Sequence, residues 1–278
     1  MQRLALLLIA LSAAAQILNP PIASDAAQTT PGERLTLLTA VCGASAADHG
    51  CDKCPPGTEF PKSRLDLEGV IYGHFLSPSS NDAAVGFFGC ESHASGLGGT
   101  ALLSREGNGW RLISIRPGVI ADDCKKLRAP DGRDVLICFG GDLHFGISDQ
   151  FLYLADFQSG GESETLGGTF FRVNDSASSC ESILMPQKGP VSGAITKVLF
   201  AAPDRITIEA RLGSITPEEF QPLEPDCAYG KPGLPGLRLA TVTRTYRFRF
   251  DGSRVVPVPG NPEMIGDTAI APETRVLK

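Results

Sequence analysis

Four acidic and imidazole side chains recur in a repeated segment and have the chemistry of metal ligands. The pattern F-G-x-[DE]-x-H occurs at 88–93 and 139–144, and its titratable groups are Glu91, His93, Asp142 and His144. Carboxylates and imidazoles bind divalent transition metals, so both copies together, joined by His74, would suit a metal-binding protein or a metal-dependent hydrolase. The alternative is structural, because a repeated loop also repeats its histidine as a turn cap. No HExxH-type motif fixes a metal geometry, and we predict no resident cofactor.

A second candidate is the pair Cys51-x-x-Cys54. This spacing occurs in redox proteins, where a helix N-terminus lowers the pKa of one thiol. Here Pro55 and Pro56 follow directly, and they prevent a helix beyond its first turn. We therefore predict that both cysteines form structural disulfides.

The chain contains eight cysteines, an even number that indicates a disulfide framework in an exported protein. Cys124 and Cys138 flank a predicted hairpin with its turn at 130–133, and facing positions on antiparallel strands are close enough for a disulfide. We predict this pair. A pairing of Cys180 with Cys227 is also expected, without a geometric argument. The cysteines left to pair among themselves are Cys42, Cys51, Cys54 and Cys90.

The elements that must position these residues begin with one helix. Thr30 is suited to the N-cap, Pro31 to the first helical position and Glu33 to the third, and Gly43 is the expected stop. A turn-rich, cysteine-rich connector follows and extends to residue 63.

Beyond the connector, short apolar runs are separated every eight to twelve residues by Gly, Pro, Asn or Asp, which is typical of successive antiparallel strands. The copies of the repeat each follow an apolar strand that begins beside an aspartate, Asp82 or Asp134. The predicted strands are 67–75, 83–89, 99–106, 110–116, 124–129, 134–140, 150–157, 168–173, 193–201, 205–212 and 237–250, with a further short strand from Val255.

Composition agrees with an all-β fold. The 278 residues include 31 Gly and 21 Pro, more than a helical bundle tolerates. Repeated units of three to four strands are typical of propeller blades. We predict an all-β protein of antiparallel meander units, propeller-like in arrangement, with a β-sandwich as the alternative and a short N-terminal helix.

The N-terminus resembles a secretory signal, with Arg3, the apolar run 4–11 and small residues at 13–15. The predicted organisation is a signal peptide at 1–24, cleaved between 15 and 27, a helix and cysteine-rich connector at 25–63, and an all-β domain at 64–278. No apolar run approaches the roughly 20 residues needed to span a bilayer, so no membrane insertion is expected. The expected location is secreted or periplasmic.

One strand carries a resemblance to a known family. The run 131–136, Asp-Gly-Arg-Asp-Val-Leu, which leads to Phe139-Gly140, resembles the end of the FG-GAP (integrin-type) propeller repeat. That resemblance implies a propeller blade. The calcium loop of the family needs alternating Asp or Asn, which 126–130 lack, so it implies no calcium site. The stretch 69–157 is also similar to a group of secreted bacterial proteins that brings no activity with it.

Charge and motifs restrict the function. The formal net charge of −6 disfavours the phosphate contacts that nucleic-acid binding requires. The segment 146–150 lacks the closing glycine of a nucleophile elbow, and 95–100 lacks the lysine of a phosphate loop. We predict a non-catalytic binding module with a protein or glycan partner, and keep the metal-dependent function as the alternative.

Overall fold

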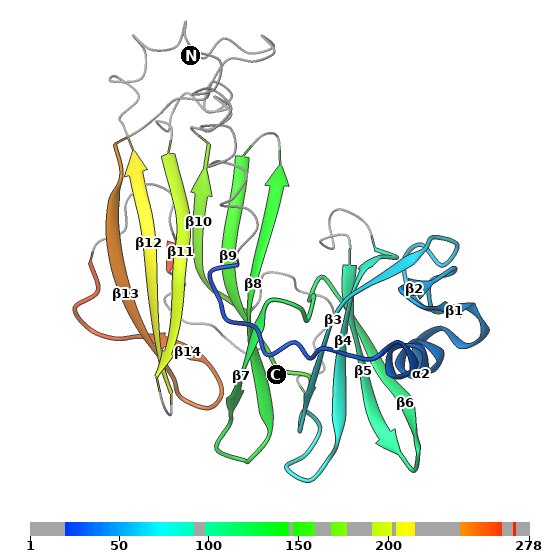
Figure 1. Cartoon of the computed structure of the whole chain (residues 1–278). Helices are drawn as coiled ribbons and strands as arrows, with labels where there is room; N and C mark the ends of the chain where they lie inside the picture. The colour runs from blue at the N-terminus through cyan, green and yellow to red at the C-terminus, as the bar shows by residue number, and fades with distance from the viewer. Residues whose placement is uncertain are drawn as a thin grey trace, which may run out of the picture.

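The computed structural model describes residues 20–91, 98–144, 147–158, 168–176, 191–201, 204–214, 240–262 and 269–270. In this part the chain is mostly β-strand, arranged in three antiparallel sheets (Figure 1). One short helix precedes the strands. The predicted all-β class with an N-terminal helix is confirmed.

Helix α2 spans Pro31–Cys42 and begins where the sequence predicts. The Thr30 hydroxyl accepts a hydrogen bond from the backbone N–H of Glu33 at 3.3 Å, which caps the first turn. The helix ends at Gly43, whose φ of 61° lies in the left-handed region that glycine adopts without steric penalty. No helix in the described residues is long and apolar enough to cross a bilayer.

The first sheet has the order β1-β2-β3-β4-β5-β6, so its strands follow one another as neighbours. The ends of β3 to β6 fall within two residues of the predicted strands. The strands are β1 (Ala46–Ala47), β2 (Gly50–Cys51), β3 (Leu65–Gly73), β4 (Asp82–Gly89), β5 (Gly98–Glu106) and β6 (Gly109–Pro117), with the 3₁₀ turn η1 (Gly43–Ser45) between α2 and β1.

The second sheet has the order β15-β10-β9-β8-β7, and the third has the order β11-β12-β13-β14. Their strands are β7 (Cys124–Arg128), β8 (Asp134–His144), β9 (Ile147–Ala155), β10 (Thr169–Asp175), β11 (Val191–Ala201), β12 (Arg205–Ser214), β13 (Val242–Phe250), β14 (Val255–Pro257) and β15 (Ala269–Ile270). The predicted strand 237–250 thus forms from Val242 onward, and its first residues, 237–239, lie outside the described part.

The second and third sheets together form a curled half-barrel. β10 and β11 lie side by side (Figure 1), and the backbone N–H of Ser176 donates to the carbonyl of Val191 at 3.0 Å where the two sheets meet. Consecutive strands are neighbours within each sheet, so the predicted meander units are present. The described strands form a half-barrel that packs against a further sheet, and the propeller-like arrangement stays a prediction.

The concave side of the half-barrel holds an aromatic core. Phe248 is 1% exposed and its ring centroid lies 5.4 Å from that of Phe170 and 6.0 Å from that of Phe171. Tyr246 packs on Phe171 at 5.1 Å. This core joins the inner faces of the second and third sheets.

The other face of the second sheet packs against the first sheet. On β8, Val135 and Ile137 face the concave core, while Leu136 and Cys138 face the first sheet. Both faces of β8 are buried over 134–138, which explains the continuous apolar run there. The opposite face of the first sheet is covered by α2 and the cysteine-rich connector.

A glycine allows the chain to pass closely between these two sheets. A Cβ on Gly86 would lie 2.7 Å from the backbone nitrogen of Ala121, in the segment that links β6 to β7. Ala121 is itself fully buried in the core between the sheets. The sheet can therefore hold this crossing segment only where β4 has no side chain.

Residues 20–30, which we call the N-terminal strap, run across all three sheets before entering α2 (Figure 1). The carbonyl of Pro21 accepts from the Val198 N–H of the third sheet at 2.8 Å. Ile22 is 2% exposed and belongs to the concave core. The Ala27 N–H donates to the Val70 carbonyl of the first sheet at 2.7 Å. The strap therefore binds to elements that lie far apart in the sequence.

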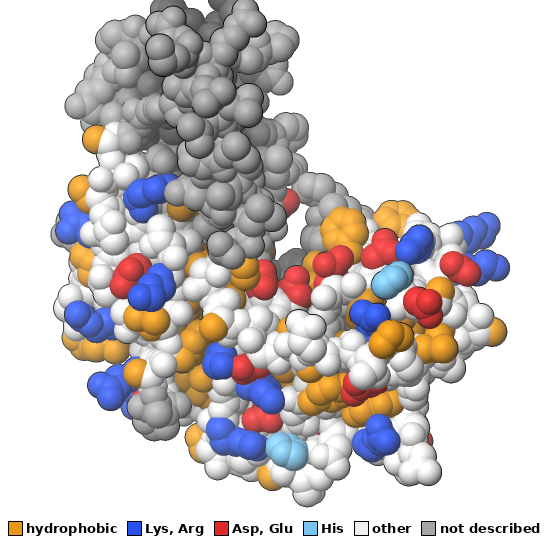
Figure 2. All heavy atoms as spheres, viewed as in Figure 1, with side chains coloured by type: hydrophobic (Ala, Val, Ile, Leu, Met, Phe, Trp, Pro, Cys, Tyr) orange, Lys and Arg blue, Asp and Glu red, His pale blue; other side chains and the backbone are white. Residues whose placement is uncertain are grey.

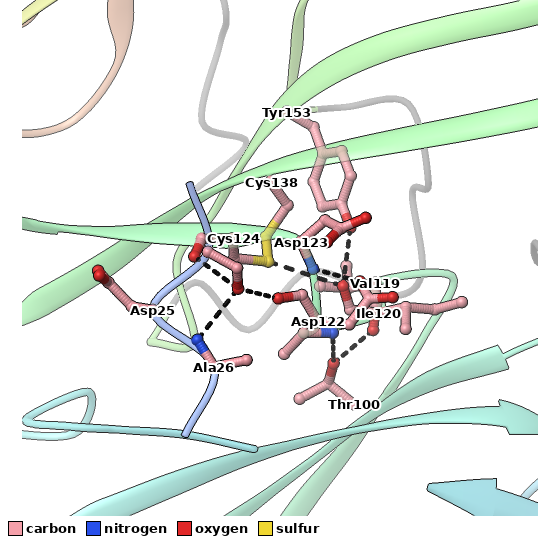
Figure 3. The surroundings of a disulfide bond; sticks show 12 residues. Asp25, Ala26, Thr100, Val119, Ile120, Asp122, Asp123, Cys124, Cys138 and Tyr153 are labelled. Carbon is pink, nitrogen blue, oxygen red and sulfur yellow. Dashed lines mark hydrogen bonds between the residues drawn. A yellow bond between two sulfur atoms is a disulfide. The ribbon is translucent and has the colours of Figure 1, made fainter. Parts of the chain in front are cut away.

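The middle of the strap is fixed on β7. The backbone N–H of Asp25 donates to the Cys124 carbonyl at 2.8 Å, and its carboxylate accepts from the Lys126 N–H at 2.8 Å and pairs with the Lys125 ammonium at 2.5 Å. Figure 3 shows Asp25 and Ala26 beside the Cys124–Cys138 disulfide. This one aspartate carries most of the polar attachment of the strap to the second sheet.

Three disulfides lie in the described residues. Cys124 is joined to Cys138 across the β7–β8 hairpin, where the two residues are direct register partners, as the sequence predicts. The cysteines of the Cys-x-x-Cys segment do not pair with each other. They form the bonds Cys42–Cys51 and Cys54–Cys90, which tie the connector to α2 and to the end of β4. The expected pair Cys180–Cys227 lies outside the described residues.

Candidate functional site

The structure describes two of the four predicted metal ligands fully. Glu91 is 6% exposed, and burial raises the pKa of its carboxyl, one oxygen of which has no hydrogen-bond partner among the residues that the structure describes. Asp142 is exposed on β8. His93 and the side chain of His144 lie outside the described part, and among the described residues no three His, Cys, Asp or Glu side chains form a metal-binding group. The quartet therefore stays a prediction.

The two copies of the repeat adopt different local structures. Gly89 ends β4 with a φ of 90°, and the chain turns into Cys90 and Glu91. Gly140 remains within β8, where a Cβ would lie 2.5 Å from the Phe151 ring. The carboxylates that follow therefore occupy a buried turn in one copy and an exposed strand in the other. The two copies of the sequence repeat therefore do not share one backbone structure at their carboxylates.

The starts of β4 and β8 do come together, at a pocket of about 540 Å³ where the first sheet meets the β7–β8 hairpin. Its size falls within the range of small-ligand sites. The lining side chains are acidic, basic and aromatic, and one imidazole and one amide join them. They belong to Tyr72, His74, Asn81, Asp82, Arg105, Trp110, Lys126, Arg128 and Asp134, and Gly73 completes the wall.

Two buried aspartates lie at the base of the pocket. Asp134, 5% exposed, accepts from the His74 N–H at 2.8 Å, and the Asp134 N–H donates to the His74 carbonyl at 2.9 Å. Asp82, 1% exposed, accepts from the Leu76 N–H at 2.8 Å through Oδ2. Its Oδ1 is buried and has no hydrogen-bond partner among the described residues. A buried unpaired acceptor costs free energy, so a donor brought by a ligand would be stabilised here.

An aromatic pair forms another wall of the pocket. The rings of Tyr72 and Trp110 stack with centroids 5.9 Å apart, and the Arg105 guanidinium lies 5.1 Å from the centre of the Trp110 ring. The Tyr72 hydroxyl donates to the Glu33 carboxylate of α2 at 2.6 Å. Burial, then this carboxylate, raises the pKa of Tyr72. The phenol therefore stays protonated and holds its ring in place.

Three cations surround the mouth of the pocket. Arg128 pairs with Asp134 at 3.3 Å. Lys126 donates to the Tyr72 carbonyl at 2.6 Å, and Arg105 rests on Trp110. Neither Lys126 nor Arg105 forms an ion pair with a carboxylate of the described residues. Two positive charges are therefore available to a ligand.

A second titratable cluster lies outside the pocket, beside the Cys124–Cys138 disulfide (Figure 3). Burial, with the neighbouring Asp122 as a smaller cause, raises the pKa of Asp123 to about 6. Burial also raises the pKa of Asp122. Neither carboxylate lines the pocket. We treat the pair as a determinant of stability and not as part of the site.

Most of the pocket was not predicted from the sequence. The sequence suggests His74 for the metal site and places Asp82 and Asp134 beside the starts of two apolar strands. That recurrence is the signal that points to the pocket. Tyr72, Trp110 and the three cations lie on other strands, and no spacing in the sequence links them.

Figure 2 shows Lys and Arg side chains interspersed with Asp and Glu over much of the described face, with a row of acidic side chains near its middle.

Scans against protein-family models, curated proteins and solved structures found no match to this chain. The resemblance to FG-GAP repeats and to secreted bacterial proteins therefore stays a prediction.

Proposed function

We propose that the protein is an exported binding module that holds a glycan in the pocket between the first sheet and the β7–β8 hairpin. The observation that supports this is the combination, in one cavity, of an aromatic pair with buried carboxylates and unpaired cations. Glycans present both hydroxyl groups and apolar C–H faces, so they need polar partners and an apolar wall together.

The hydrogen bonds of the pocket favour binding over catalysis. The His74 ring nitrogen Nδ1 contacts the Ser80 carbonyl, and one oxygen of each aspartate is occupied by a backbone N–H. These groups hold the β3–β4 turn against β8. An acid–base pair must exchange protons with a substrate, and groups committed to the backbone are poorly suited to that.

Export is supported by the disulfides. Disulfides persist in oxidising compartments, and three are present in the described residues. The predicted cleavage range of 15–27 overlaps the strap, whose Ile22 and Asp25 bind the sheets. Cleavage early in this range, before Pro21, would keep these contacts, whereas cleavage beyond Asp25 would remove them.

The single tryptophan of the chain gives a direct test, because Trp110 lies in the pocket. Its fluorescence should change when an oligosaccharide that an array identifies is titrated in, and the Trp110→Phe variant should lose affinity for that oligosaccharide on the array. Phe60→Leu is the matched control, since Phe60 is 44% exposed and does not line the pocket. If no oligosaccharide binds, or if binding leaves Trp110 fluorescence unchanged, the pocket is not a glycan site.

A further inference from the structure

The charges of the pocket restrict the kind of glycan that it accepts. The chain has a formal net charge of −6, yet the pocket mouth carries Arg105, Lys126 and Arg128. Only Arg128 is paired with a carboxylate, Asp134, among the described residues. A neutral ligand would leave the charges of the other two without a counter-charge.

The two unpaired cations are held in place by different contacts. The Lys126 ammonium is fixed by the Tyr72 carbonyl at 2.6 Å, so its remaining N–H groups can point elsewhere. The Arg105 guanidinium rests on Trp110 with its carbon 5.1 Å from the ring centre, which fixes its position without using its donors on a carboxylate. Pre-positioned donors of this kind favour an anionic group, because little side-chain entropy is lost on binding.

The base of the pocket has the opposite preference. Asp82 is 1% exposed, and its Oδ1 has no hydrogen-bond partner in the described part of the chain, whereas its Oδ2 accepts from the Leu76 N–H. A buried carboxylate oxygen needs a donor and repels a second anion. The ligand must therefore present a hydroxyl to the base and its negative charge to the mouth.

We propose that the ligand is an acidic saccharide, whose carboxylate or sulfate binds Arg105 and Lys126 while a hydroxyl group approaches Asp82 and the aromatic pair of Tyr72 and Trp110 bounds the sugar ring. This rests on the proposed glycan-binding function and adds the charge of the ligand. Simple anions lack the hydroxyl that Asp82 requires, and neutral sugars lack the charge.

The test is a titration of the intact mature protein followed by Trp110 fluorescence, with calorimetry as a second readout. The probes are trigalacturonate, a sulfated disaccharide, neutral maltotriose, and sodium acetate and sodium sulfate as simple anions. We expect at least one acidic saccharide to bind about tenfold or more tightly than maltotriose and the simple anions, and to weaken as salt is raised.

Two variants test the roles of the cations. Arg105→Gln and Lys126→Gln should each weaken binding of the acidic saccharide about tenfold and leave the melting temperature close to that of the wild type. Arg111→Gln is the matched control, because Arg111 lies on β6 beside Trp110 but pairs with Glu106 at 3.4 Å outside the pocket. It should bind as the wild type does.

The outcomes separate the two proposals. Equal binding of maltotriose and the acidic probes, unchanged in both variants, would overturn the acidic ligand and keep the glycan site. Equal binding of the simple anions would show an anion site without a saccharide, which also overturns the inference. Failure of every saccharide, on the array as well, would overturn the proposed function itself.

Discussion

The first and third sheets are stabilised in different ways. The first sheet has a core with many small side chains, including Ala83, Ala84 and Ala101. One disulfide, Cys54–Cys90, ties the connector to the end of β4, and another, Cys42–Cys51, ties α2 to β2. The third sheet has no cysteine in its described strands and buries large aromatic rings, Tyr246 and Phe248 among them. Buried aromatic area gives a large hydrophobic gain, whereas a core of alanines gives little and leaves more of the stability to cross-links.

The largest expected effect comes from the aromatic core. Phe248→Ala should lower the free energy of unfolding by about 3–5 kcal/mol, because it removes a fully buried ring that contacts Phe170 and Phe171. Urea unfolding would measure the loss. Arg249→Ala, on the exposed face of the same strand, is the control and should change stability by less than about 0.5 kcal/mol. A similar loss in both variants would contradict an aromatic core as the main source of stability.

The cross-linked sheet should respond to the loss of a disulfide. Replacing Cys54 and Cys90 together by Ala should cost about 2–4 kcal/mol, because the bond closes a loop between positions 36 apart. Hydrogen exchange should show lost protection in β4 and β5, with β12 and β13 retained. The Cys42–Cys51 bond, with a separation of 9, is the internal comparison and should cost about 1 kcal/mol less. Uniform loss of protection across all sheets would contradict the idea that the disulfides stabilise the first sheet more than the third.

The strap connects the two regions, so its polar attachment should matter to both. Asp25→Ala removes the carboxylate that accepts from the Lys126 N–H and pairs with Lys125, and we expect a loss of about 1–3 kcal/mol. Thermal unfolding would report it. Asp52→Ala, at an exposed position of the connector, should be nearly neutral. If Asp25→Ala were as neutral as the control, the attachment of the strap would contribute nothing measurable to the stability of the sheets.

The smallest effect concerns pH. The raised pKa of Asp123, about 6, means that the folded state binds this proton more tightly than the unfolded chain does. Its stabilising contribution is therefore full below about pH 4 and is lost as pH rises toward 6. Asp123→Asn should add about 1 kcal/mol at pH 7, a modest gain because solvent screens the half-exposed carboxyl, and should flatten the profile between pH 4 and 6. An unchanged profile from chemical unfolding at several pH values would rule out Asp123 as the titrating group.

The elements that were predicted well depend on local geometry. The limits of α2 follow from Thr30 and Gly43, which act within one turn of the helix. The β7–β8 hairpin follows from its turn residues, and the facing positions of Cys124 and Cys138 follow from the hairpin. Each of these inferences needs only neighbours in sequence or facing positions on adjacent strands.

The elements that were missed depend on long-range contacts. Tyr72, Arg105, Trp110 and Lys126 come from β3, β5, β6 and β7, and only the packing of the β7–β8 hairpin against the first sheet brings them to one pocket. The predicted signal peptide at 1–24 overlaps the strap at 20–24, and the partners of the strap, such as Val198, lie far along the chain, where local spacing does not reveal them.

The sequence by itself determined the longer strands, the helix and one disulfide, because hydrophobic periodicity, capping and turn residues act over a few positions. The tertiary structure alone decided which face of each strand meets which sheet, that β10 and β11 continue into a half-barrel, and that Asp82 and Asp134 share a pocket with Trp110. The physical reason is that burial depends on the sum of many weak long-range contacts, and no single spacing along the chain records that sum.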